Sequence, residues 1–481
     1  MNLSLVRLEV MLLRRSPVAL AMVALVALLC VGALATGAAD LRQRQAANAK
    51  FLADASKSET RFREMLVSIE TGAQMSPLAA RPMAISRSAA LDDGILGDFS
   101  AGAGDLYPSR VRVRLFENSA SLFENYQFGN PTLLRFGGFD MSAIVIVLMP
   151  LLMIALCFDT LGADRNTGRI NLTQLCGVSE QEYLFNRLAV RSGALWLTLI
   201  LATLIAALLN PGQALLSDRL LHYVAWLGGA LLYGGFWFLA LAWIVRRAAD
   251  SGQAVGRLIA LWIVVVLIAP ALAIAAVQAA FPAHSRLAYL SDVRAVASRA
   301  DEQQGAVIEA YQAMDPELYW NDLPKEAPFR EGYLRTMLVE KATLQHRERF
   351  DRVQERRANA SSWLQLISPA IAADTFLAKI SSGDVGRYQV FQADARALLA
   401  SFAQRLGHSI LKGERISVAE YDKLPTIPKR GEPLAVARSV LLGSAAILAL
   451  FLIGVCIVER TQGGAGRPMG SGRESLGHSG S

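Results

Sequence analysis

The stretch "CFDTLGADRNTGRINLTQLCGVSEQEYLFNRLAVR", residues 157–191, decides the fold, because it is dense in charge, glycine and turn formers yet separates two strongly apolar runs. These runs, Met141–Phe158 and Ser192–Leu209, approach the roughly 20 residues that a membrane-spanning helix needs. A loop that only reverses the chain can be a few residues long. The sequence therefore predicts that the chain leaves a membrane here, uses the polar segment for a purpose of its own, and returns.

Composition supports a membrane protein with sizeable polar parts. The chain has 481 residues, of which 53% are hydrophobic and 19% charged, and its mean hydropathy is +0.33, which excludes an ordinary soluble domain. Six apolar runs meet or approach the spanning length: Pro17–Thr36, Met141–Phe158, Ser192–Leu209, Leu220–Val245, Leu258–Phe281 and Val436–Val458. We expect an all-α polytopic membrane protein with six transmembrane helices and a mainly helical extracytoplasmic domain. Pro150 and Pro270 interrupt the second and fifth runs.

Arginines beside the runs set the expected orientation, because positive charges near a span resist crossing the membrane. Arg7, Arg14 and Arg15 precede the first run, so we expect both ends of this multi-pass chain in the cytoplasm. The first run is either a cleaved signal peptide or a retained anchor, and its length favours the anchor.

This orientation divides the chain into six parts. They are the N-terminus with span one (1–36), a first periplasmic segment (37–140), spans two to five with a cytoplasmic loop at 159–191 (141–281), a second periplasmic segment (282–435), span six (436–458) and a disordered tail (459–481). In the first periplasmic segment the pattern predicts a helix ending near Gly72, turns from there to Pro108, and a short strand in "RVRVRLF". In the second it predicts helices over Leu287–Met314, Gly332–Leu366 and Gly386–Leu411.

No enzymatic motif is present in the sequence. It lacks HExxH, CxxC, GxxxxGK[ST] and GxSxG, and its five histidines have no metal-site spacing, so we expect neither an enzyme nor a cofactor on this chain. The net charge of +7 is scattered over both sides of the expected membrane, which argues against nucleic acid as a partner. The middles of the apolar runs hold almost no ionisable residues, which disfavours an ion-coupled transporter.

The 159–191 segment itself predicts two short helices at the membrane surface, joined at Gly177. In "RINLTQL" apolar residues alternate with polar ones, and Ser179 precedes the next helix as an N-cap with Glu182 at capping-box spacing. The alternative interpretation is an amphipathic interfacial hairpin with no partner.

The same segment resembles the cytoplasmic coupling region of ABC transporter permeases of the type-two exporter class. The residues that match its pattern, or lie within it, are Asp164, Arg165, Gly168, Arg169, Val178, Ser179, Glu182 and Arg187. The sequence departs from the pattern by having Asp where Glu is commoner and Asn186-Arg187 where a Lys is usual.

A second stretch, "LQLISPAIAADTFLAKISSGDVGRYQVFQADARALLASF", is similar to a subgroup of these permeases with a long outer segment between spans five and six. The residues at the places of its motif are Ser368, Pro369, Gly383, Arg387, Tyr388 and Phe391. The two resemblances, in this order along six spans, cover most of the chain.

The resemblance implies a permease subunit of an exporter in the inner membrane of a bacterium, with ATP and Mg bound on a separate ATPase subunit. The implied partners are that ATPase, docked on residues 164–187, a second permease protomer of the same or a sister chain, the lipid bilayer and a periplasmic accessory protein. The alternative is a non-transporting membrane scaffold or receptor whose periplasmic part senses or assembles. The substrate, the direction of transport and the identity of the second protomer stay open.

Overall fold

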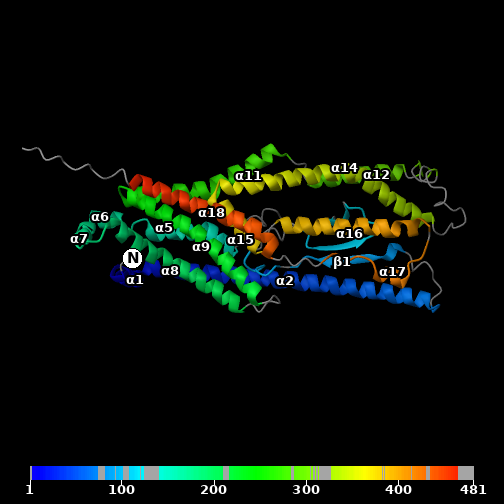
Figure 1. Cartoon of the computed structure of the whole chain (residues 1–481), viewed down its shortest axis with the longest axis horizontal. Helices are drawn as coiled ribbons and strands as arrows, with labels where there is room; N and C mark the ends of the chain where they lie inside the picture. The colour runs from blue at the N-terminus through cyan, green and yellow to red at the C-terminus, as the bar shows by residue number, and fades with distance from the viewer. Residues whose placement is uncertain are drawn as a thin grey trace, which may run out of the picture.

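The structure is a computed structural model of the chain, and it is mostly helical. It describes residues 3–73, 82–92, 94–100, 108–119, 121–123, 140–209, 216–282, 286–303, 305–306, 309, 313, 327–381, 383, 385–412, 414–428 and 434–463. The molecule is elongated, with apolar helices gathered at one end and polar helices with a small sheet at the other (Figure 1). We call these two parts the apolar bundle and the distal lobe. The expected disordered tail lies outside the described residues from position 464 onward.

The apolar bundle combines helices from the whole length of the chain. Its elements are α1 (Leu3–Arg15), the first half of α2 (Pro17–Glu70), α4 (Met141–Ala143), η4 (Ile144–Leu148), α5 (Met149–Cys157), α6 (Gly162–Asn166), α7 (Arg169–Leu175), α8 (Glu180–Leu209), α9 (Leu216–Arg247), α10 (Ser251–Trp262), η5 (Ile263–Ile268), α11 (Ala269–Ala280), η7 (Leu364–Leu366), α15 (Pro369–Ile380) and α18 (Leu434–Gly463). One continuous core of buried side chains joins α2, α5, α8, α9, α10, α15 and α18.

Four helices are long and apolar enough to cross a membrane, which indicates a multi-pass membrane protein. They are Pro17–Glu70, Glu180–Leu209, Arg219–Arg247 and Ser251–Ala280. The expected second and sixth spans correspond to shorter apolar helices, Met141–Cys157 and Leu441–Ile457, within the described residues. Large apolar side chains on α8 and α11 face outward, as they do in a helix that contacts lipid.

Two π-helical turns show how the bundle accommodates proline. The turns η4 and η5 lie directly before Met149-Pro150 and Ala269-Pro270. Proline removes a backbone donor and its ring crowds the carbonyl one turn earlier, and a wider turn relieves that clash while leaving carbonyls without helical partners. Side chains from neighbouring helices supply the missing donors, since the Tyr233 hydroxyl donates to the Ile146 carbonyl at 3.0 Å. In a lipid environment such replacement is required.

The distal lobe packs around the second half of α2. Its other elements are η2 (Pro82–Ala84), β1 (Ser86–Ala90), β2 (Arg110–Arg114), η3 (Ser121–Phe123), α12 (Arg286–Glu302), α14 (Ala327–Trp363), α16 (Val385–Leu411) and α17 (Val418–Asp422). Strands β1 and β2 pair antiparallel, with Ser86 opposite Arg114, and their inward side chains share a core with Phe62, Phe391 and Phe402. The predicted helix end is confirmed, because α2 ends at Glu70 and Gly72 has a positive φ of 75°.

Three features differ from the sequence expectations. The chain is not all-α, because the predicted strand at 110–114 finds a partner in 86–90, where only turns were expected. The N-terminus forms a separate helix α1, which packs on α8 and exposes Leu8, Met11 and Leu12, the pattern of an interfacial helix. Helix α15, expected in the second periplasmic segment, has its buried side chains in the core of the apolar bundle.

Candidate functional site

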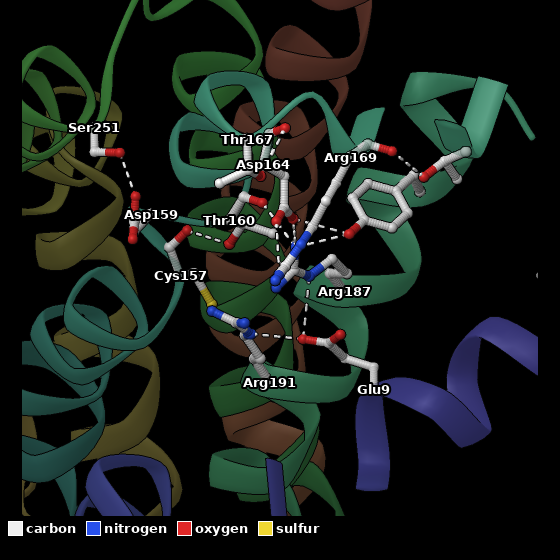
Figure 2. Close-up of polar contacts among 12 residues, drawn as sticks. Glu9, Cys157, Asp159, Thr160, Asp164, Thr167, Arg169, Arg187, Arg191 and Ser251 are labelled. Atoms are coloured by element: carbon white, nitrogen blue, oxygen red, sulfur yellow. Dashed lines mark hydrogen bonds and ion pairs between the residues drawn. The ribbon is translucent and has the colours of Figure 1, made fainter. Parts of the chain in front are cut away.

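The candidate site lies at the end of the apolar bundle opposite the distal lobe, where α6, α7 and the start of α8 meet α1 (Figure 1). Figure 2 shows a network of polar side chains that converge between these helices. We call Glu9, Asp164, Tyr183, Arg187 and Arg191 the polar cluster. The predicted coupling residues of the 159–191 segment divide between this cluster and the exposed surface next to it.

Two glycines give the segment its two predicted short helices. Gly168 has a φ of 70° and starts α7, while Gly177, with a φ of 79°, ends it. At that end the Gly177 amide donates to the Gln174 carbonyl at 2.9 Å and the Val178 amide to the Thr173 carbonyl at 3.3 Å. This pair of hydrogen bonds is the Schellman motif, which glycine makes possible because it tolerates a positive φ. The turn at Val178 therefore reverses the chain into α8.

The predicted cap at the start of α8 is confirmed. The Ser179 hydroxyl accepts from the Glu182 amide at 3.2 Å, which satisfies one of the unpaired amides of the first helical turn. Glu180 and Glu182 both lie in this first turn, where negative charge complements the helix dipole. Glu182 therefore serves the helix start, and the residue is half-buried.

Asp164 lies at the centre of the polar cluster and is buried. Its carboxylate accepts from the Tyr183 hydroxyl at 2.9 Å and from the Arg187 guanidinium, and it forms a longer contact of 3.5 Å with Arg169. Arg187 also donates to the Thr160 carbonyl at 3.1 Å, which ties α8 to the end of the second apolar run. Burial of a carboxylate is tolerated because it is paired and hydrogen-bonded on several sides.

Glu9 of α1 completes the cluster from the N-terminal side. Its side chain is only 5% exposed, and one oxygen, Oε1, accepts from Arg187 Nε at 3.2 Å and from Arg191 Nε at 2.9 Å. Arg191 in turn donates to the Leu156 carbonyl at 3.0 Å. Two buried carboxylates, on Glu9 and Asp164, thus balance two arginines, so the cluster carries no net charge into the bundle.

Arg165 faces away from Asp164 and fastens α6 to the end of α9. Its guanidinium donates to the Ala248 carbonyl at 2.8 Å and to the Arg246 carbonyl at 3.1 Å, and it pairs with Glu180. These carbonyls at the C-terminal end of α9 have no helical partners, and arginine is well suited to cap them. The adjacent residues Asp164 and Arg165 therefore make separate contacts, Asp164 with α8 and Arg165 with the end of α9.

Beside this packed framework, α7 presents an apolar surface. Ile170 is buried against the bundle, but Leu172 is 65% exposed and Leu175 is 84% exposed, with Cys176 exposed next to them. Arg169 is also largely exposed, at 71%, although its guanidinium reaches back toward Asp164 (Figure 2). A lone exposed leucine needs no explanation, but adjacent leucines on a rigidly held helix form a contact surface. We call Leu172, Leu175 and Cys176 the α7 surface.

The second group of predicted residues does not form one site. Ser368 caps α15, accepting from the Ala370 amide at 3.2 Å, and lies with Pro369 inside the apolar bundle. The Gly383 amide donates to the Ala378 carbonyl at 2.9 Å and so ends that helix. Arg387, Tyr388 and Phe391 follow on α16, and Phe391 belongs to the core of the distal lobe. These residues connect the two parts of the molecule.

Sequence reasoning missed Glu9, Tyr183 and Arg191 as members of the cluster. A usable signal exists for Tyr183, which precedes Arg187 by one helical turn and therefore shares its face. Glu9 is a lone acidic residue among basic and apolar ones in α1, which is a weaker signal. Within the described residues no group of three or more His, Cys, Asp or Glu side chains is arranged to hold a metal ion.

The comparisons with known proteins match one range in the C-terminal part of the chain. A family model described as a domain of unknown function (DUF3526) matches residues 286–427. This range begins with α12 and includes α14, α15, α16 and α17, whereas the polar cluster and the α7 surface lie outside it. No curated protein and no solved structure matches the chain.

Proposed function

We propose that this chain is the membrane-spanning permease subunit of an ATP-binding-cassette transporter, with the α7 surface as the docking site for a separate ATPase subunit. The observation that carries the proposal is the arrangement of the 159–191 segment. Its charged residues Asp164, Arg165 and Arg187 turn inward to the bundle, while Leu172 and Leu175 face outward. A segment that only reversed the chain would not need two exposed leucines on a rigidly held helix.

The polar cluster explains how a force on α7 would reach the bundle. Asp164 connects α6 to α8, Arg165 connects α6 to the end of α9, and Glu9 connects α8 to α1. An ATPase that pushed on α7 would therefore move α1, α8 and α9 together instead of bending a loose loop. ATP-driven closure of two ATPase subunits would then rock two permease protomers, identical or sister chains, about a substrate path between them.

The proposed topology places six spans in a bacterial inner membrane, with the ends of the chain and the α7 surface in the cytoplasm. Its support is the sequence pattern of arginines beside the spans, together with the shorter apolar helices Met141–Cys157 and Leu441–Ile457. The distal lobe then lies outside the membrane, where it contacts substrate or an accessory protein. ATP and Mg would be held by the ATPase, and export is the direction that the resemblance implies.

The experiment is co-expression of this chain with a candidate ABC ATPase subunit from the same organism, followed by purification in mild detergent. The test variant is the double substitution Leu172→Glu, Leu175→Glu, which leaves every contact of the polar cluster intact. We expect the wild-type chain to retain the ATPase and stimulate its hydrolysis, and the variant to lose both. A variant at Arg165 would be a poorer test, because it would also release α6 from α9.

The matched control is Gln174→Glu, which adds charge to the same helix at an exposed position between the two leucines. It should leave ATPase binding within about fivefold of wild type, since one added surface charge changes binding by less than about 1 kcal/mol. Equal ATPase retention by the double variant and by the control would contradict the proposal that the α7 surface is the docking site. Absence of any bound ATPase with the wild-type chain would favour the alternative, a scaffold or receptor.

A further inference from the structure

The segment between α14 and α15 descends along the bundle from the distal lobe. At the outer end of α11, Arg357 Nε donates to the Phe281 carbonyl at 2.7 Å, so α14 reaches the bundle at the level where the span Ser251–Ala280 ends. Eleven residues further on, the Ser368 hydroxyl donates to the Val265 carbonyl at 2.8 Å. About 24 Å of helix separates Val265 from Phe281 at 1.5 Å per residue.

This descent ends well inside the apolar layer. Val265 lies midway along the span Ser251–Ala280, with 14 residues on one side and 15 on the other, so its carbonyl lies near the middle of a hydrocarbon core about 30 Å thick. The Val265 carbonyl belongs to the π-helical turn before Pro270, which leaves it without a helical donor, and Ser368 satisfies it. The Ser368 hydroxyl therefore supplies the hydrogen bond that the backbone of the fifth span lacks at this point, and the bond is buried.

We call residues 363–367, where the chain turns from α14 into α15, the corner. Its exposed and buried side chains are distributed as they are in a segment embedded in lipid. Trp363 is 70% exposed, Leu366 51% and Ile367 56%, whereas the polar Gln365 between them is buried and accepts from the Ser444 hydroxyl of α18 at 3.1 Å. In water the opposite arrangement is expected, with the amide outside and the large apolar groups inside. In lipid, polar groups must find protein partners and apolar groups face outward.

We propose that residues 357–380 form a re-entrant hairpin that enters the bilayer from the side of the distal lobe, with Trp363, Leu366 and Ile367 in contact with lipid acyl chains. The occupant of this apolar corner is lipid, because α14 and α15 pack against the fifth span, whose Leu267 and Leu272 are exposed as well. Arg352 and Arg356 precede the corner on the exposed side of α14, at the level of the headgroups, where arginine is favoured.

Helix α15 returns from the corner through the bundle and not across lipid. It packs between α9 and α18, and the ring of Phe376 fills the space over Gly229, where a Cβ would overlap it. The hairpin is thus anchored by side-chain packing on its returning arm and by the Ser368 and Gln365 bonds at its tip. This placement does not depend on the proposed ATPase, so the two can be tested separately.

The test places a single cysteine at the corner. Trp363→Cys and, separately, Ile367→Cys are made in a chain whose four native cysteines are replaced by serine, with Glu355→Cys on the exposed side of α14 as the matched control. Each is labelled with a neutral fluorescent maleimide in detergent and reconstituted into vesicles of phosphatidylcholine or of brominated phosphatidylcholine. A second sample of each, unlabelled, is reconstituted and treated with a charged, membrane-impermeant maleimide.

We expect brominated lipid to quench the label at 363 and 367 but not at 355, and the charged maleimide to react about tenfold more slowly at 363 and 367 than at 355. Rapid reaction with the charged reagent at both corner positions, without quenching, would place the corner in water and overturn the proposal. Absence of quenching together with a disulfide-linked pair of chains on oxidation would replace lipid by a second copy, and would overturn it equally. Two corner positions are used so that a folding defect in one leaves the other to decide.

Discussion

Glu9 and Arg187 form a buried ion pair between helices that are 178 positions apart in the chain, with 3.2 Å between Oε1 of Glu9 and Nε of Arg187. The same arginine binds Asp164 through its other face. One guanidinium therefore joins the N-terminal helix to the loop that carries the α7 surface, through α8. Removing either carboxylate would leave buried positive charge without full compensation.

We predict that Glu9→Ala lowers the free energy of unfolding by about 3 kcal/mol, because it leaves Arg187 and Arg191 short of a buried partner. The measurement is the thermal unfolding midpoint in detergent, followed by circular dichroism. The comparison variant is Arg169→Ala, whose guanidinium is largely exposed and lies 3.5 Å from Asp164, and which should cost less than about 1 kcal/mol. Equal losses in the two variants would contradict a special role for the buried pair.

Arg165→Lys should loosen α6 and α7 without unfolding the bundle. Lysine keeps the charge but cannot donate at once to the Ala248 and Arg246 carbonyls and to Glu180, as the planar guanidinium does. We expect backbone amides of residues 162–175 to exchange hydrogen about tenfold faster, which corresponds to about 1.4 kcal/mol of lost local stability. Mass spectrometry of the exchanged chain measures this, and Arg169→Lys, with unchanged exchange, is the control.

Cys176 supplies a native reporter of the proposed ATPase contact, because it is exposed at the end of α7. In a Cys456→Ser background, we expect a charged maleimide to modify Cys176 rapidly in the chain alone and about tenfold more slowly when the ATPase is bound, since a docked surface excludes the reagent. The rate is followed by intact-mass spectrometry. Slow modification that persists after Leu172→Glu, Leu175→Glu would show that something other than docking protects the thiol.

The distal lobe should lose stability in acid through Glu340. Burial raises the pKa of this carboxyl, but hydrogen bonds from the Ser119 amide and hydroxyl, each at 2.7 Å, together with Arg347, outweigh burial and hold the pKa below its ordinary value of 4.5. A carboxyl whose pKa is lowered by folding contributes stability above its unfolded pKa, and that contribution is lost as pH falls through the lower folded value.

We therefore predict that Glu340→Gln lowers the unfolding midpoint at neutral pH, at a cost of about 1–2 kcal/mol, and weakens its fall below a pH of about 4.5. The measurement is thermal unfolding of the whole chain at a series of pH values. Glu355→Gln, on the exposed side of the same helix, should leave the pH profile unchanged. A profile for Glu340→Gln that parallels wild type would contradict the assignment.

Local features of the chain were predictable from sequence wherever a neighbouring residue determines them. The helix end at Gly72, the reversal at Gly177 and the cap at Ser179 depend on residues a few positions apart, so the pattern of glycine and serine is sufficient. The strand at 110–114 was visible because its alternation is local. The partner strand, "SRSAA" at 86–90, has little alternation and is defined only by its distant pairing.

The missed features depend on contacts between distant parts of the chain. Glu9 becomes significant only because α1 folds back on α8, and α15 enters the bundle only because Ser368 and Phe376 find partners on other helices. In the candidate site, the sequence identified Asp164, Arg165 and Arg187 but not the direction of their side chains. The exposed leucines of α7 were visible as an amphipathic pattern, but not which side faces away from the bundle.

Helix α2 runs unbroken for 54 residues from the apolar bundle into the distal lobe, a length of about 81 Å. Because the helix is continuous, the first span and the part of the lobe that packs on it would move as one rigid body. A tilt of about 5° at the inner end displaces the far end by about 7 Å, with no change in the helix itself. A small tilt at the inner end of α2 would therefore become a displacement at the lobe large enough to open or close a contact there.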